Sequence, residues 1–447
     1  MRPYPLRSNP RERCSFGGFT HSKSDPSLLL LRQQQVNIYL LIYVDDILLT
    51  GDNPAAITEL LSKLNLKFAM KNLGDAHAFL GIQIRKHNSQ YFLSQESYAV
   101  TILQHANLLD CNGLASPTCT KFPSDFGQDS HLSDPRTYRS ITGALKYLTL
   151  TRPDIAFSTN LLSQHMHDPG PQHVYMLKHL LRYIKGTLDF GLPITKSNLI
   201  LRSFSDADWE GDPISRKSTS GFCSFLSDTL ISWTVKKQHT VARSSTESEY
   251  RSLAALTADI IWLKRILTDF GIPSDQPTDL FCDNTSAIAL ANNPVFHART
   301  KHIEIDQRFV RDHITNHNIR LLPISTVDQV ADILTKSSLS TPRFQQLITK
   351  LTTLQLQFCS NPHVLRSDPC SRARVLVPTR FTCALRASYN QPAALSGMTS
   401  TSYVTLLVIA TPNCTCSSDL QGTMPLRLAC TGLTTCLHSR GYALTRM

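Results

Sequence analysis

The sequence predicts a mixed α/β protein, and the pattern between residues 199 and 340 carries that prediction. Apolar segments of strand length precede a long helical segment, and further strands and helices follow it. Hydrophobic residues make up 41% of the 447 residues and charged residues 18%, so the chain can bury a core. We therefore expect a mixed five-stranded sheet with helices in this part, within a chain of about two or three domains.

The first strand of this part carries two carboxylates. In Arg202–Asp212 (RSFSDADWEGD), Asp206 and Asp208 stand two positions apart, so in a strand both project from one face. Two like charges this close are costly unless a cation or solvent accommodates them. An acidic strand end that faces solvent is the alternative interpretation, and the downstream segments bear on the choice.

Downstream of Asp206, apolar runs, turn residues and helical spacing predict an ordered series of elements. They are strands at Gly221–Leu226, Leu230–Val235 and His239–Ala242, a helix at Glu247–Phe270, a strand at Leu280–Asn284, a helix from Thr285, a helix at His302–His313, a strand at Ile319–Ile324 and a closing helix at Asp328–Lys336.

Four carboxylates fall at strand ends or at inward helix positions of this series: Asp206, Glu249, Asp283 and Asp332. Carboxylate oxygens are the ligands that Mg²⁺ prefers. Glu249 has a competing structural interpretation, because Thr246 and Glu249 fit a capping box at the start of the long helix.

The motifs around these acids read SDADW, SSTESEY, CDN and ADILTK. With them, residues 199–340 resemble the ribonuclease H domain of Ty1/copia-type retrotransposons. The resemblance implies an RNase H-like fold in which Asp206, Glu249, Asp283 and Asp332 are catalytic and bind Mg²⁺ or Mn²⁺. It also implies an endonuclease that hydrolyses RNA in RNA–DNA hybrids, where two metal ions help to deprotonate a water and relieve charge on the leaving 3′ oxygen.

Residues 36–51 (VNIYLLIYVDDILLTG) predict two apolar strands that flank Asp45 and Asp46. Apolar flanks raise the cost of ionising both acids, and a divalent metal relieves that cost, although an ordinary Asp-Asp turn is the alternative. The stretch resembles motif C of copia-type reverse transcriptases, and residues 64–84 resemble the continuation of that palm. The resemblance implies a truncated palm at residues 17–95 with Asp45 and Asp46 as metal ligands. Since the fingers and a third aspartate precede this point in the family, we expect no polymerase activity.

Residues 96–198 predict helices, including one at 138–154 and one at 172–185. The region resembles the thumb and connection segment of the same family, through TRPD at 151–154 and YIKGT at 183–187. One side of the second helix is basic, and it is either simply solvated or tracks phosphates. The candidate nucleic-acid-binding residues are Lys178, Arg182, Lys185, Lys236, Lys237 and Arg243.

The overall charge favours a polyanionic partner. Lys and Arg outnumber Asp and Glu by 45 to 34, a formal net charge of +11, which favours an RNA–DNA hybrid or other nucleic acid before an anionic membrane surface. No secretory signal or bilayer-spanning stretch is visible, so we expect no membrane partner. Scattered cysteines favour a reducing compartment, the cytoplasm first and the nucleus second.

The two ends of the sequence match no pattern. Residues 1–16 stay unassigned, since their arginines fit a transit peptide or, as we prefer, a frayed terminus. Residues 341–358 complete the family-like part. Residues 359–447 show no repeat or periodicity, and we expect them to be poorly ordered.

The sequence leaves two functions open. The first is a retrotransposon-derived ribonuclease H attached to an incomplete reverse transcriptase domain. The second is an inactive or co-opted nucleic-acid-binding remnant, in which the truncated palm exposes apolar surface and destabilises the chain. A Mg²⁺-dependent cleavage assay on a labelled hybrid separates them.

Overall fold

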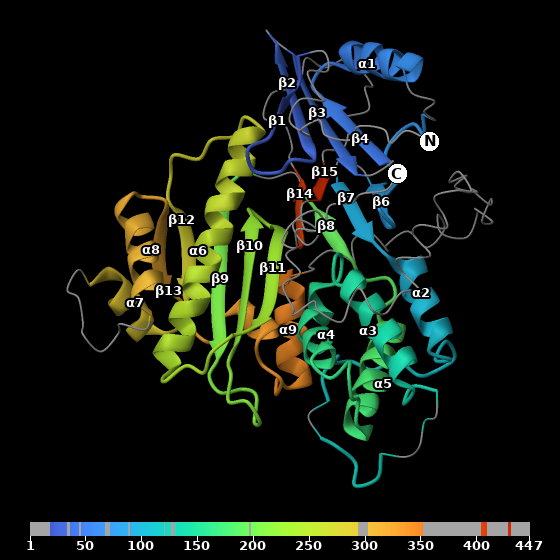
Figure 1. Ribbon diagram of the computed structural model, residues 1–447, viewed down its shortest axis with the longest axis vertical. Coiled ribbons are helices and arrows are strands. Elements are labelled where there is room, and N and C mark those ends of the chain that lie inside the picture. The colour runs from blue at the N-terminus through green and yellow to red at the C-terminus, as the bar shows by residue number, and fades with distance from the viewer. Residues whose placement is uncertain are drawn as a thin grey trace, which may run out of the picture.

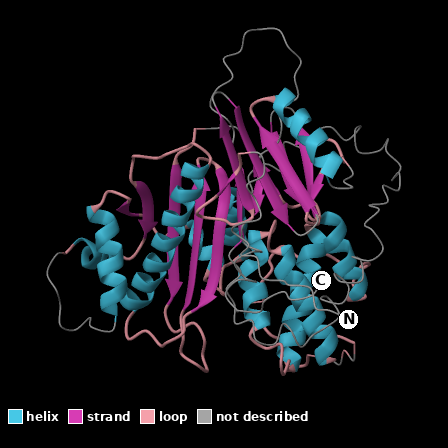
Figure 2. Cartoon of the chain, turned by 45° about the horizontal axis from the view of Figure 1, so that its top comes forward, coloured by secondary structure: helices cyan, strands magenta, loops and turns pink. Residues whose placement is uncertain are grey.

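The computed structural model describes most of the chain up to residue 351 and two short segments beyond it (Figures 1 and 2). The described residues are 18–33, 36–43, 46–67, 72–87, 90–119, 121–126, 129, 131–195, 198–293, 303–351, 404–408 and 428–430. Their strands form three sheets, against which helices pack. Of the two predicted metal ligands in the hairpin, Asp45 lies outside the described residues and Asp46 inside them.

The predicted hairpin at Asp46 is confirmed as part of an antiparallel sheet of order β1-β2-β3-β4. The elements are β1 (Thr20–His21), β2 (Leu28–Gln33), β3 (Val36–Tyr43), β4 (Asp46–Gly51) and the helix α1 (Pro54–Lys67). Tyr43 pairs in register with Asp46 at the start of β4. Because side chains alternate along a strand, β2 and β3 present one apolar row to each face of the sheet.

Both faces of this sheet are covered. Ile38 and Leu40 of β3 pack with Leu60 of α1 on one face. On the other face Tyr39 joins the main core, and its hydroxyl donates to Phe270 O at 3.0 Å, at the end of α6. The apolar rows of β2 and β3 are therefore buried by α1 on one face and by the main core at the end of α6 on the other, so these rows do not form the exposed apolar surface that the second hypothesis assumed.

A second antiparallel sheet, of order β5-β6-β7-β8, leads into a group of helices (Figure 1). The elements are β5 (Ala78–Phe79), β6 (Ile82–His87), β7 (Gln90–Ser94), β8 (Leu192–Ile194), α2 (Glu96–His105), α3 (Pro135–Leu148), η2 (Pro153–Ile155), α4 (Ala156–Ser163) and α5 (Pro171–Gly186). The helical character predicted for this part is confirmed. The helix predicted at 138–154 is shorter, because the ring of Pro153 would clash with the carbonyl four residues earlier.

The third sheet is mixed and has the order β13-β12-β9-β10-β11-β14-β15. Its strands are β9 (Leu201–Asp208), β10 (Thr219–Leu226), β11 (Thr229–Lys237), β12 (Thr278–Cys282), β13 (Ile319–Pro323), β14 (Val404–Val408) and β15 (Leu428–Cys430). Strands β9, β10 and β11 are antiparallel neighbours, whereas β12 runs parallel to β9 and to β13. The predicted mixed α/β class is confirmed.

Strands β14 and β15 fall in the segment 359–447, for which we expected little order. They extend the sheet beyond β11, where Ser232 pairs with Thr405. The rest of that segment lies outside the described residues.

Helices cover the third sheet on both faces. They are α6 (Ser245–Asp269), α7 (Thr285–Asn292), α8 (Glu304–Thr315), the 3-10 helix η4 (Val330–Leu334) and α9 (Thr341–Leu351). Ser205 of β9 donates to Ser252 of α6 at 2.9 Å. The next residue, Asp206, contacts Thr335 beyond η4. Since adjacent side chains of a strand project from opposite faces, α6 and η4 lie on opposite faces of β9.

Two predicted elements of this part are wrong. Residues 239–242, predicted as a strand, form the loop before α6, because His239, Thr240 and Val241 are exposed and have no apolar row to bury. The closing helix predicted at 328–336 is the shorter 3-10 helix η4. None of the helices in the described ranges is both long and apolar enough to cross a membrane.

Candidate functional site

Asp206 lies near the end of β9, at the centre of the candidate site. In the register of the sheet it stands opposite Gly221 of β10. A Cβ atom on Gly221 would lie 2.5 Å from Thr335 Cγ2 and 2.8 Å from Leu334 Cβ, which is closer than such atoms approach. The lack of a side chain at Gly221 therefore lets η4 and the turn after it lie against the sheet beside Asp206.

Asp206 is only 1% exposed, and its carboxylate is held by the two residues that follow η4, Thr335 and Lys336. Thr335 Oγ1 donates to Asp206 Oδ2. Lys336 Nζ lies 3.1 Å from Asp206 Oδ1 and 3.0 Å from Oδ2. Burial alone would lower the pKa of Lys336, but its carboxylate neighbours, Asp206 first, raise that pKa above its ordinary value. The ammonium therefore stays charged.

Asp332 reaches the same place from η4. Lys336 Nζ lies 3.9 Å from Asp332 Oδ1, and Arg343 Nη2 lies 3.3 Å from Asp332 Oδ2. Within the described part of the chain, Asp332 Oδ1 is buried without a hydrogen-bond partner. Burial first, and then the charge of Asp206, raise the pKa of Asp332 to about 6.

Glu249 is available to the site because other residues cap its helix. Ser244 is the N-cap of α6, and its Oγ accepts from Glu247 N at 3.2 Å. Glu247 Oε2 in turn accepts from Arg243 N at 2.9 Å. The predicted capping box of Thr246 with Glu249 is therefore wrong, since the cap lies two residues earlier and Glu247 serves it.

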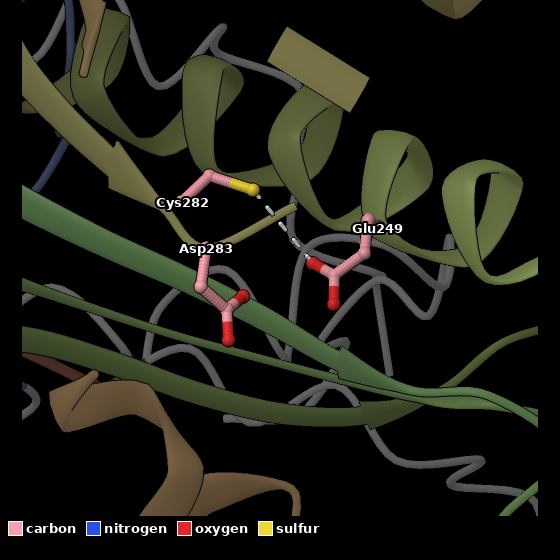
Figure 3. Close-up of side chains that lie close together, drawn as sticks. All are labelled: Glu249, Cys282 and Asp283. Atoms are coloured by element: carbon pink, nitrogen blue, oxygen red, sulfur yellow. Dashed lines mark hydrogen bonds between the residues drawn. The ribbon is translucent and has the colours of Figure 1, made fainter. Parts of the chain in front are cut away.

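Glu249 meets Cys282 and Asp283 at the end of β12 (Figure 3). One ligand atom from each of the three residues lies within 4.8 Å of the others. Cys282 Sγ donates to Glu249 Oε2 at 4.0 Å, and Thr326 Oγ1 donates to Asp283 Oδ2 at 3.2 Å. The helix α6 and the parallel strand β12 thus bring together residues that are 33 positions apart along the chain.

The site carries more negative than positive charge. Within the described ranges, the ion pairs that reach the four acids come from Lys336 and Arg343. Burial first, and then the charges of Asp206 and Asp283, raise the pKa of Glu249 to about 9. Buried carboxyls with raised pKa values, grouped at one place, are a common property of functional sites.

This arrangement fits a divalent cation. Such an ion would favour the ionised form of Glu249, whose pKa is raised by burial first and then by the charges of Asp206 and Asp283, and it would give a ligand contact to Asp332 Oδ1, which has no hydrogen-bond partner. The oxygen donors of Asp206, Glu249, Asp283 and Asp332 suit a hard cation such as Mg²⁺ or Mn²⁺. The Cys282 thiol is a softer donor beside this set, and Mg²⁺ does not require it.

Two other predicted or neighbouring acids differ from these four. The Asp208 carboxylate accepts a hydrogen bond from the backbone N–H of Thr219. The pKa of Asp208 is raised to about 6, and burial is the main cause. Asp46 is exposed at the start of β4. Among the residues that the structure describes, Asp46 belongs to no group of three or more possible metal ligands.

Several residues of the site were not predicted from the sequence. They are Gly221, Cys282, Thr335, Lys336 and Arg343. One signal was available for Lys336, which follows Asp332 by four positions and so lies on the same side of a helical turn. The others depend on contacts between distant segments.

The candidate nucleic-acid-binding residues fall into two groups. Three have partners within the protein: Lys178 pairs with Asp129 at 2.5 Å, Arg182 Nε donates to Asn112 O at 3.0 Å, and Lys237 Nζ donates to Gln164 Oε1 at 2.9 Å. The other three, Lys185, Lys236 and Arg243, are half-buried or exposed. A role of these six residues in binding phosphates stays a prediction.

Comparison with known proteins adds to this geometry. Residues 18–120 match the family described as reverse transcriptase (RNA-dependent DNA polymerase). The chain is 41% identical over 340 residues to the retrovirus-related Pol polyprotein from transposon RE2 of Arabidopsis thaliana, a match that covers 76% of this chain and 23% of the polyprotein. This chain thus spans about a quarter of the length of that relative.

Parts of the chain are also similar to a second relative and to a solved structure. An uncharacterized mitochondrial protein of Arabidopsis thaliana is 49% identical over 226 residues, covering 50% of this chain and 94% of that protein. The solved N-terminal RNase H domain of a Mycobacterium tuberculosis protein, fused to maltose-binding protein, is 12% identical and covers 34% of this chain and 98% of that chain. The TM-score of this similarity is 0.24.

Proposed function

The chain belongs to the family of Pol polyproteins from copia-type retrotransposons, and on this premise we propose that residues 199–340 form a ribonuclease H domain. The proposed reaction is the hydrolysis of RNA in RNA–DNA hybrids with Mg²⁺ or Mn²⁺. The observation that carries the proposal is the convergence of Asp206, Glu249, Asp283 and Asp332 from β9, α6, the end of β12 and η4.

The four acids would hold the cation. When bound, divalent cations in such a site supply charge relief at the phosphate and at the leaving 3′ oxygen, and they lower the pKa of a water. The chain itself supplies preorganisation. Thr335 and Lys336 fix the Asp206 carboxylate, Arg343 fixes Asp332, and the cap at Ser244 fixes the start of the helix that carries Glu249.

The proposed contact surface for a nucleic acid lies beside the site. Trp209, three residues after Asp206, is 48% exposed, and its Nε1 donates to Ala242 O at 3.2 Å. Arg243, the next residue, is exposed. An exposed aromatic ring suits stacking on bases, and an exposed guanidinium suits contact with phosphates. We include Lys236 and Arg243 in this surface.

The remaining segments keep their proposed roles. Residues 17–95 form the palm segment and 96–198 the thumb and connection, and the reverse transcriptase match at 18–120 spans the border between them. Residues 341–358 complete the family-like part. In the described ranges Cys111, Cys119, Cys223 and Cys282 are free thiols, which suits a reducing compartment such as the cytoplasm.

The test is cleavage of a hybrid with labelled RNA by the full chain, with Mg²⁺ and with EDTA. We expect Asp206→Asn to lower the cleavage rate by about three orders of magnitude, since a neutral amide is a poorer ligand for a hard cation. Asp259→Asn is the matched control. Asp259 is also buried, but its carboxyl group has a hydrogen bond with Ser232 of β11. We expect this variant to cleave at the parent rate.

The outcomes separate the two functions. Metal-dependent cleavage that Asp206→Asn removes and Asp259→Asn retains supports the ribonuclease. Binding of the hybrid without cleavage, equal in the parent and Asp206→Asn, would favour an inactive nucleic-acid-binding remnant.

A further inference from the structure

Lys336 has an unusual place in the site, because its ammonium lies between carboxylates from two different elements. Nζ is 3.0 Å from Asp206 Oδ2 on β9 and 3.9 Å from Asp332 Oδ1 beside it on η4. Both carboxylates are buried, at 1% and 4% exposure. A positive charge therefore already occupies the place where these two acids face each other.

The two cations of the site are held differently. Arg343 also donates to Thr326 O at 2.8 Å and to Gln346 Oε1 at 3.1 Å, so several protein groups fix its guanidinium. The Lys336 ammonium instead contacts the carboxylates of Asp206 and Asp332. The Lys336 side chain is 34% exposed, so its long flexible stem has a path to solvent.

We propose that Lys336 is a resident counter-cation, which competes with the divalent cation for Asp206 and Asp332 and leaves them when that cation binds. This inference rests on the proposed function, because it concerns the same carboxylates. Two positive charges at roughly 4 Å repel strongly in a partly buried place, where the effective dielectric constant is about 20. Lys336 is thus a positioning residue that keeps the acids together and compensated in the metal-free protein.

The physical consequence is a pair of effects with opposite signs. Without metal, removal of the ammonium leaves the buried Asp206 carboxylate without its cationic partner and leaves Asp332 with Arg343, and this destabilises the protein. With metal, the same removal abolishes the competition and strengthens cation binding. A residue with a purely structural role would produce the first effect without the second.

The experiment compares the full-length parent with Lys336→Met and a control, Lys350→Met. Lys350 Nζ pairs with Asp328 at 3.0 Å and its side chain is 35% exposed, so the control removes an equal charge from a similar ion pair on the neighbouring helix α9. The thermal unfolding midpoint is measured in EDTA and then against MgCl₂ concentration, and isothermal calorimetry gives the Mg²⁺ dissociation constant.

For Lys336→Met we expect a lower unfolding midpoint in EDTA and a Mg²⁺ dissociation constant lower by about tenfold or more, as the loss of one neighbouring unit charge implies. Lys350→Met should leave the Mg²⁺ dissociation constant at the parent value. A constant that is unchanged or higher in Lys336→Met would overturn the proposal.

A second variant keeps the test decisive if Lys336→Met does not fold. Lys336→Arg retains the charge and adds a planar fork that pairs well with carboxylates, so we expect weaker Mg²⁺ binding than in the parent. Stronger Mg²⁺ binding in this variant would contradict competition. Failure of the proposed function looks different, because the parent would then bind Mg²⁺ without cleaving the hybrid.

Discussion

Two buried ionic clusters of this molecule differ in how far their charges are balanced. In the helical part, Arg152 is 2% exposed and pairs with Asp154, with Nη2 2.7 Å from Asp154 Oδ2. Its Nη1 donates to Thr187 O at 2.8 Å, and Tyr183 OH donates to Asp154 Oδ2 at 2.7 Å. One positive charge thus meets one negative charge. In the candidate site, four acids share two cations.

This difference in charge balance indicates which of the two clusters can bind a ligand. A closed network such as that of Arg152 and Asp154 leaves nothing for a ligand to supply, so its role is to fix η2 against the end of α5. In the cluster around Asp206, burial first and then the neighbouring carboxylates raise the pKa of Glu249 and of Asp332, so the protein does not fully offset the cost of charging these two carboxyls. An external cation can complete that cluster.

The largest effect on stability should come from breaking the balanced network. We expect Arg152→Met to lower the free energy of unfolding by about 3–5 kcal/mol, because Asp154 then stays buried without its partner. Denaturant unfolding measures it. The double variant Arg152→Met with Asp154→Leu should recover most of that loss, since it removes both charges. Equal losses in both variants would mean that the network does not depend on charge balance.

In the cluster around Asp206, by contrast, removing a carboxyl group should stabilise the metal-free protein at high pH. Because the pKa of Glu249 rises from 4.5 to about 9 on folding, its contribution to stability is present below pH 4.5 and is lost as the pH rises toward 9. We therefore expect metal-free Glu249→Gln to be more stable than the parent at pH 8 to 9 and about equal to it near pH 5. Thermal unfolding in EDTA across this pH range measures the difference.

The control for this prediction is Glu247→Gln. Glu247 is buried, caps α6 and pairs with Arg251 at 2.5 Å, so this variant should lose about 1–3 kcal/mol of stability, without the gain at high pH. In the cleavage assay Glu249→Gln should be slower by orders of magnitude, whereas Glu247→Gln should stay near the parent rate. The same pH profile for the parent and Glu249→Gln would remove Glu249 from the cluster.

The smallest effect is expected at the exposed acid of the hairpin. Asp46→Asn should change the free energy of unfolding by less than about 0.5 kcal/mol, because exposed positions tolerate such changes. It should also leave hybrid cleavage at the parent rate. A large loss of cleavage in Asp46→Asn would show that the hairpin and the cluster act together. It would contradict the view that cleavage depends on the buried acids and not on the exposed one.

Much of the fold could be predicted from local patterns. The hairpin of β3 and β4, the apolar stripe of α5 and the long helix α6 follow from side-chain periodicity, which the sequence displays directly. The predictions that were wrong concern weak local signals. Residues 239–242 have strand-like composition but no face to bury, and residues 328–336 form only one short 3-10 helix.

The sequence by itself predicted the α/β class, the similarity to copia-type Pol polyproteins and the four carboxylates of the candidate site. The tertiary structure decided which carboxylates are buried together, that Ser244 rather than Thr246 caps α6, and that Gly221 makes room for Thr335 and Lys336 beside Asp206. The reason is physical. Side-chain periodicity indicates which side of its own helix or strand a residue faces. The charge balance of a cluster depends instead on distant segments that lie within a few ångströms of one another only in the folded protein.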